Sequence, residues 1–401
     1  MRIGHRLAVA GLALLCLPAA TGAPRWIGAF GAPPIGYEPG RPKDALNRPL
    51  ANETARQIVR VGAGGTALRI RLSNELNDQP LRIGAASIAR VDAQGAIVPG
   101  TLRPLTFGGA AGVTIPSGAP YFSDPVEGAV AADTDYAISL YYPETSTPPA
   151  HAQMIDLAPG DQTLRPMLDQ QARIRAPGLV TGIDVETPGR HPVLVAYGDS
   201  ITEGAASTPG AHMSWPEQLG RRLGTACWSV VNQGISGNRI LFTGRGPSAL
   251  ARFDRDALSV PGVNTIVLLE GINDIGSGHD PKSAADDKSV EELIAADRQM
   301  IARAHAKGIR IIGGTLTPFE GAAYADEKGE AKRVALNHWI RTGGAFDAVI
   351  DFEAAVRDPA HPARMIPADE HGDHLHPDDA GYTLMAQAAE PVIRRLGCPA
   401  D

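Results

Sequence analysis

The chain has 401 residues, of which 43% are hydrophobic and 20% are charged, and its formal net charge is −7. This length provides enough residues for a hydrophobic core in each of two domains. The acidic balance and the lack of a basic stripe along the sequence argue against a nucleic acid as a partner.

The N-terminus has the pattern of a secretory signal peptide. A basic start is followed by an apolar run at 7–17 and by small residues up to Ala23. The apolar run is too short to span a membrane comfortably, so we expect no integral membrane span. We predict that residues 1–23 are a signal peptide and that the protein is secreted or periplasmic. We do not expect a lipid on Cys16, because Leu15 stands where a lipoprotein signal has a small residue.

Residues 24–185 have the pattern of an all-β domain. Short runs of alternating apolar residues are separated by segments that contain Gly and Pro, and these runs span 56–61, 67–72, 81–91 and 134–142. Many short strands joined in this way indicate a sandwich or jelly roll, so we predict a β-sandwich accessory domain. A stretch containing Pro, Gly and Thr, at 177–192, predicts a linker to the next domain.

From residue 186 to 401 the pattern changes to alternating strands and helices. Apolar runs of strand length lie at 193–198, 228–233, 265–270, 309–315 and 347–351. The clearest helical stretches are 216–223, 290–306, 332–340 and 379–396. This alternation implies a second domain of the α/β class, whose parallel sheet is covered by helices on both faces.

The first strand of this second domain ends in Gly198-Asp199-Ser200-Ile201. Ser200 would therefore lie at the carboxyl end of a strand, where open α/β sheets bind their ligands. A helix that starts here also offers free backbone N–H groups, which suit an oxyanion. Such a tripeptide is also common in ordinary turns, so Ser200 is a candidate nucleophile only in combination with other segments.

Two further strand ends carry candidate hydrogen-bond donors. Gly234 follows the strand at 228–233, and a glycine there lets its backbone N–H approach a ligand closely; a simple Gly-rich turn is the alternative. Asn273 follows the run at 265–270 and has a side-chain amide that could donate to a developing oxyanion. The alternative for Asn273 is a cap on the following helix.

Near the C-terminus, Asp373 and His376 are three residues apart. On a helical turn such residues are neighbours, so Asp373 is placed to orient the imidazole of His376. An imidazole held in this way can take the proton of a serine hydroxyl. Two alternatives remain open: a solvated acidic turn before the last helix, and a metal site, because six His and Asp residues crowd into 371–379.

Taken in order, Gly-Asp-Ser-Ile, Gly234, Gly-x-Asn-Asp and Asp-x-x-His resemble the four signature blocks of the GDSL or SGNH hydrolase superfamily. The resemblance covers roughly residues 190–398. It implies a flavodoxin-like three-layer α/β/α sandwich with a parallel sheet. It also implies a serine esterase that needs no metal or organic cofactor.

Carried over by position, the resemblance gives each residue a role. Ser200 is the nucleophile, His376 is the general base and then the acid, and Asp373 is its partner. The oxyanion hole consists of the Ser200 N–H, the Gly234 N–H and the side chain of Asn273. The family often has glycine after the aspartate, where this chain has a histidine.

The resemblance leaves several substrates open. An export signal, an appended β domain, and segments 269–276 and 315–321 that resemble the branch related to acetylxylan esterases favour O-deacetylation of a carbohydrate. A lipase, lysophospholipase or arylesterase that acts on short-chain acyl esters is the alternative. A carbohydrate-binding module with a vestigial hydrolase domain is an alternative of another class. The oligomeric state stays open.

Two cysteines, Cys227 and Cys398, remain once the signal peptide is removed. A pair of cysteines in an exported protein indicates a disulfide. Cys227 would begin the second strand at the bottom of the sheet, and Cys398 follows a last helix that returns from the top to the bottom. We therefore predict a Cys227–Cys398 bond, with two separate buried thiols as the alternative.

Overall fold

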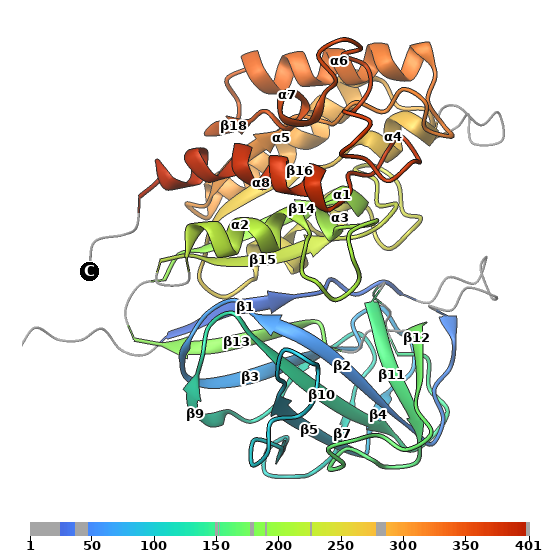
Figure 1. Ribbon diagram of the computed structural model, residues 1–401, viewed down its shortest axis with the longest axis vertical. Helices are drawn as coiled ribbons and strands as arrows, with labels where there is room; N and C mark the ends of the chain where they lie inside the picture. Colours follow the sequence, from blue (N-terminus) through green and yellow to red (C-terminus); the bar gives the residue numbers. More distant parts are fainter. Residues whose placement is uncertain are drawn as a thin grey trace, which may run out of the picture.

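A computed structural model gives the fold of the chain (Figure 1). The residues that the structure describes are 25–36, 47–148, 151, 153–176, 180–188, 191–224, 227–277 and 286–397. The predicted signal peptide, 1–23, lies outside them. None of the helices within these ranges is long and apolar enough to cross a membrane.

The N-terminal region is built from antiparallel sheets, as its alternating pattern predicts (lower half of Figure 1). One sheet runs in the order β1 (Arg25–Gly31), β13 (Gly182–Thr187), β3 (Gly65–Ser73) and β8 (Pro120–Phe122), and β9 (Val126–Val130) also pairs with β3. The next runs β12 (Ala172–Ala176), β11 (Gln153–Pro159), β2 (Glu53–Val61), β10 (Thr134–Tyr142), β5 (Ala85–Arg90) and β6 (Arg103–Pro104). A small ribbon joins β4 (Leu81–Ile83) and β7 (Val113–Ile115).

One part of the sequence prediction for this region is wrong. The stretch 177–192, expected to be a linker, contains β13, which lies between β1 and β3 in the first sheet. Ile183 and Val185 on this strand are fully buried, and Asp184 pairs with Arg69 at 2.9 Å. The short alternation of apolar and acidic residues is therefore a strand signal, which the surrounding Pro and Gly concealed.

The second region has a five-stranded parallel sheet, as predicted. Its order is β15 (Ser229–Gly234), β14 (Val193–Gly198), β16 (Val263–Leu269), β17 (Arg310–Gly314) and β18 (Ala348–Ile350). Every residue of β14 is buried, as a central parallel strand requires. The helices are α1 (Ser200–Glu203), α2 (Trp215–Leu223), α3 (Ala249–Phe253), η2 (Asp254–Leu258), α4 (Ile272–Ser277), α5 (Val290–Ala306), α6 (Glu327–Thr342), α7 (Phe352–Val356) and α8 (Asp379–Arg394).

The helices form two groups around this sheet. Helix α8 contacts α2 and α7, whereas α5 contacts α3 and α6. Figure 1 shows α2 and α8 in front of the strands and α5 behind them. The parallel sheet is thus covered on both sides, as the alternation of strands and helices predicts.

The two regions meet where β1 lies against β15. The Gly28 N–H donates to Pro261 O at 2.8 Å, and Ser229 Oγ donates to Gly28 O at 2.7 Å. A side chain at position 31 would collide with Val231, so the glycine there permits the close approach of the two strands. The N-terminal region is therefore packed directly against the edge of the parallel sheet.

Cys227 precedes β15 and is disulfide-bonded. Its predicted partner, Cys398, lies outside the described residues.

Candidate active site

Ser200 lies on a tight turn between β14 and α1. The Asp199 side chain accepts from the Ile201 N–H at 2.9 Å and caps the helix. Gly204, in a left-handed conformation with φ of 98°, ends the helix after one turn, and its N–H donates to Ser200 O at 2.9 Å. Ser200 itself is only 5% exposed. The turn thus fixes the serine at the carboxyl end of the central strand.

The structure brings Ser200, His376 and Asp373 into one hydrogen-bonded chain. His376 Nε2 is 2.8 Å from Ser200 Oγ, and His376 Nδ1 is 2.6 Å from Asp373 Oδ2. The serine and the histidine are 176 positions apart in the sequence. The fold of the α/β region is what makes them neighbours.

Asp373 is held by its local backbone. Its Oδ1 accepts from the N–H groups of Leu375 (3.0 Å) and His376 (2.9 Å). Partial burial would raise the pKa of Asp373, but the hydrogen bonds from the His376 side chain and from these N–H groups outweigh burial and lower it. The carboxylate therefore stays ionised at neutral pH and can stabilise an imidazolium.

The expected helical turn around Asp373 and His376 is wrong. Residues 371–378 form a loop, and α8 begins only at Asp379. The two side chains meet because Asp373 folds back over the N–H groups that follow it, a short-range pattern typical of Asp. His374, where the resembling family often has glycine, has a φ of 61°. That left-handed backbone explains why glycine suits the position.

The two predicted donors from other strand ends each have a partner in this structure, but the Asn273 amide has a second N–H to offer. The Gly234 N–H donates to Asn232 Oδ1 at 2.9 Å, and a side chain at position 234 would collide with the backbone of Glu203. Gly234 therefore permits the contact between β15 and α1, and in this structure its N–H already has a partner. Asn273 Nδ2 donates to Asn238 O at 3.0 Å, which joins the loop after β16 to the loop after β15.

Sequence reasoning missed Arg252, a buried side chain on α3. Its guanidinium donates to Gly198 O (2.9 Å), Gln233 O (2.8 Å) and Asn238 Oδ1 (2.8 Å). These acceptors lie at the ends of β14 and β15 and in the loop that follows β15. Arg252 thus ties together the segments around Ser200. No local motif marks it, because its partners are far away in the sequence.

Buried acids lie under the same turn. Burial and the charge of Asp274 together raise the pKa of Asp199 to about 7, against the opposing effects of the Ile201 N–H and of Arg252. Burial also raises the pKa of Asp274 to about 6, although the N–H groups of Ile240 and Leu241 donate to it. Across the described ranges, no group of three or more His, Cys, Asp or Glu side chains is arranged to hold a metal ion.

Comparison with protein families matches residues 196–384 to the GDSL-like lipase/acylhydrolase family. The match includes Ser200, Asn273, Asp373 and His376. A search of curated proteins finds no match.

Several solved structures are distantly similar to this chain. An acetyl-xylooligosaccharide esterase mutant from Geobacillus Stearmophilus is 23% identical, covers 52% of this chain and 95% of its own, and has a TM-score of 0.39. The aryl esterase of M. smegmatis is 13% identical, covers 51% of this chain and 99% of its own, and has a TM-score of 0.42. A member of the lipolytic protein G-D-S-L family from Veillonella parvula DSM 2008 is 20% identical, covers 51% of this chain and 99% of its own, and has a TM-score of 0.38. It is the match of residues 196–384 to the GDSL-like lipase/acylhydrolase family that identifies the chain as a carboxylic ester hydrolase.

Proposed function

We propose that Ser200, His376 and Asp373 are the catalytic residues of this hydrolase. The observation that carries the proposal is the unbroken chain of hydrogen bonds from Ser200 Oγ through His376 to Asp373, at 2.8 and 2.6 Å. Ser200 Oγ attacks the ester carbonyl carbon while His376 Nε2 takes its proton. His376 then gives this proton to the leaving alcohol, and an acyl-enzyme remains.

Water completes the reaction by the same route. His376 takes a proton from the water as it attacks the acyl carbon, and returns that proton to Ser200 Oγ when the acid leaves. Asp373 keeps the imidazole oriented and stabilises its cationic form in both halves. The two halves of the reaction balance with the ester, water and these side chains, so neither half requires a metal or an organic cofactor.

The tetrahedral oxyanion needs N–H donors, and we propose the Ser200 N–H and Asn273 Nδ2 for this role. Gly234 is the third donor expected from the sequence, but the bond of its N–H to Asn232 argues against it. The Gly237 N–H is a better candidate, because it donates to no other group among the described residues. The next carbonyl along, Asn238 O, accepts from Asn273, which brings this loop beside the amide.

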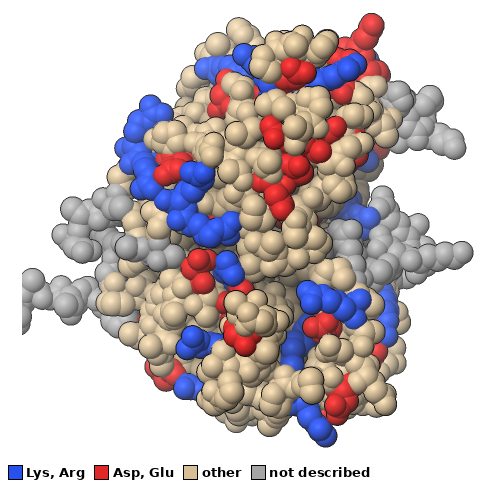
Figure 2. Space-filling model, viewed as in Figure 1, with Lys and Arg blue, Asp and Glu red and all other residues tan. Residues whose placement is uncertain are grey.

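For the substrate, we propose an O-acetylated carbohydrate of the acetyl-xylan type. The signal-like N-terminus and the appended antiparallel sheets, which we propose to be a β-sandwich accessory domain, support an exported enzyme that acts on a polymer. Figure 2 shows acidic and basic side chains interspersed on one face of the molecule, as suits an uncharged substrate. A short-chain acyl esterase of the lipase or arylesterase kind is the second candidate.

A substrate panel tests this proposal. Purified enzyme is given acetylated xylan, acetylated monosaccharides and p-nitrophenyl esters of increasing acyl length, with the Ser200→Ala variant as the blank. We expect acetate release from acetylated xylan and falling kcat/KM as the acyl chain lengthens. A preference for long acyl chains would favour the lipase alternative, and equal release by the blank would overturn the catalytic assignment.

A further inference from the structure

Glu203 connects the helix of the proposed nucleophile to the neighbouring loop. It is the last residue of α1, the single turn that begins with Ser200. Its Oε2 accepts from the N–H of Ser236 at 2.7 Å and also from the Ser236 hydroxyl. Ser236 belongs to the loop after β15, which also contains Gly237. One carboxylate therefore fixes the nucleophile turn relative to the loop that we propose to donate to the oxyanion.

The other oxygen of Glu203 faces the N-terminal region. His151 Nε2 lies 3.4 Å from Glu203 Oε1, and both side chains are largely buried, at 6% and 12% exposed. His151 Nδ1 is 3.0 Å from Pro33 O, in the segment that follows β1. Within the described residues Glu203 Oε1 accepts no hydrogen bond, so the 3.4 Å approach of His151 Nε2 is a contact at ion-pair distance and not a hydrogen bond. Because both side chains are largely buried, solvent screens this contact little.

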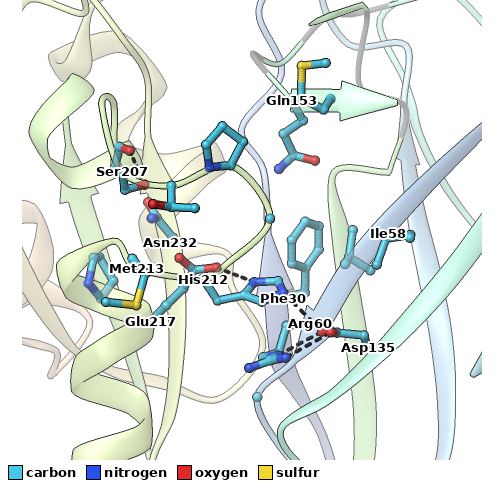
Figure 3. A pocket seen from close by; sticks show the side chains of 18 of the residues that line it. Phe30, Ile58, Arg60, Asp135, Gln153, Ser207, His212, Met213, Glu217 and Asn232 are labelled. Atoms are coloured by element: carbon cyan, nitrogen blue, oxygen red, sulfur yellow. Dashed lines mark hydrogen bonds and ion pairs between the residues drawn. The ribbon is translucent and has the colours of Figure 1, made fainter. Parts of the chain in front are cut away.

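A second ionic chain crosses the same interface but does not touch α1. Asp135 on β10 pairs with Arg60 at 2.8 Å and with His212 Nε2 at 3.3 Å. His212 Nδ1 in turn lies 2.9 Å from Glu217 on α2. Figure 3 shows His212 between the two carboxylates, on the wall of a cavity of about 750 Å³ that both regions line. These contacts from Arg60 to Glu217 serve as a control, because they hold the two regions together without reaching the proposed nucleophile.

We propose that His151 is a positioning residue for hydrolysis: through Glu203 it holds α1 and the 235–238 loop in the geometry that the reaction needs. The N-terminal region would thereby take part in the chemical step, although no catalytic side chain comes from it. This inference rests on the proposed role of Ser200. Small displacements of reacting groups are enough to matter, since about 1 Å of misplacement costs roughly 10²-fold in rate.

The test compares variants of the two ionic chains, with p-nitrophenyl acetate as the substrate. This ester is small, so we expect its KM to respond little to contacts with the N-terminal region. We expect His151→Ala to lower kcat about 10- to 100-fold with KM changed less than twofold. His151→Gln, whose amide can still donate toward Glu203, recovers most of the loss. Asp135→Asn is the matched control. We expect it to change kcat less than twofold, even if its Tm falls as much as that of His151→Ala.

A double-mutant cycle separates coupling from general damage. The loss in His151→Ala/Glu203→Gln should be smaller than the product of the two single losses, because the contact that the two side chains share can be broken only once. If His151→Ala does not fold, His151→Leu carries the test, with a kcat loss several times larger than that of Asp135→Asn. Equal kcat losses at His151 and Asp135, or a loss confined to KM or Tm, would overturn the inference.

The failure of this inference is distinguishable from that of the proposed function. If Ser200→Ala is inactive and His151→Ala is fully active, only the positioning role is wrong. If Ser200→Ala still hydrolyses the ester, the catalytic assignment itself is wrong, and the positioning role is wrong with it.

Discussion

Two sets of arginines, one in each region of the chain, are held in different ways. In the N-terminal sheets, partly exposed arginines pair with acids on neighbouring strands, as Arg60 does with Asp135 and Arg69 with Asp184. In the α/β region, Arg252 is 1% exposed and donates to the strand ends around Ser200. Charge thus supports the pairing of strands in the first region and joins the parts of the active site in the second.

The largest expected effect lies in the α/β region. Replacing the nucleophile in Ser200→Ala should lower kcat by about 10⁶-fold, because a serine triad acts as a unit. Ser207→Ala, a nearby serine whose hydroxyl donates to Gly204 O, should keep activity within about twofold. Hydrolysis of p-nitrophenyl acetate measures both. Similar activities for the two variants would contradict the proposal that Ser200, and not a neighbouring serine, is the nucleophile.

The next effect compares the two kinds of arginine directly. Arg252→Leu leaves the buried acceptors Gly198 O, Gln233 O and Asn238 Oδ1 without this donor and removes a cation from beside the buried Glu270, so we expect the free energy of unfolding to fall by about 3–5 kcal/mol. Arg60→Leu breaks a partly exposed pair and should cost about 0–1 kcal/mol. Urea denaturation followed by circular dichroism measures both. Equal losses of unfolding free energy would show that the buried Arg252 contributes no more to stability than the partly exposed Arg60.

A smaller effect is expected at the proposed oxyanion donor. Asn273→Ala should lower kcat about 10²- to 10³-fold, as removal of one such donor typically does. The variant should leave KM for p-nitrophenyl acetate nearly unchanged, because the interaction forms fully only in the transition state. An unchanged kcat would show that Asn273 does not donate to the oxyanion and that its amide only joins the two loops.

The smallest effect concerns Asp297, a buried acid of α5 whose Oδ1 has no hydrogen-bond partner within the described ranges. Burial raises the pKa of Asp297 well above its usual value, and the charge of Asp274 adds to this. The folded chain therefore keeps a proton that the unfolded chain releases above about pH 4, so the wild type loses stability as pH rises. Asp297→Asn lacks this loss, and its stability relative to wild type should grow by up to about 1.4 kcal/mol per pH unit. Urea denaturation at pH 5, 6 and 7 measures the difference, and a constant or shrinking difference would contradict it.

The sequence predicted most where a pattern is local. Apolar runs gave the five parallel strands, because central strands such as β14 are buried on both faces and must be apolar throughout. Strand ends marked Ser200 and Asn273, and the short spacing of Asp373 and His376 marked their pairing. Each of these signals lies within a few residues of the feature it predicts.

What the sequence did not predict depends on distant partners. β13 was hidden by neighbouring Pro and Gly and is defined by its place between β1 and β3. Arg252 has no motif, and its role follows only from where three other segments end. The partner of the Gly234 N–H is a side chain two residues away, and an Asn-x-Gly pattern alone does not reveal which donor stays free.

The most direct test of the central claim is active-site labelling. Wild-type enzyme is treated with an alkyl fluorophosphonate, digested and mapped by mass spectrometry, alongside the His376→Ala variant. We expect one phosphonyl adduct, on Ser200, formed far more slowly when the imidazole at 376 is removed. An adduct on another residue, or the same rate of labelling in both proteins, would contradict the account.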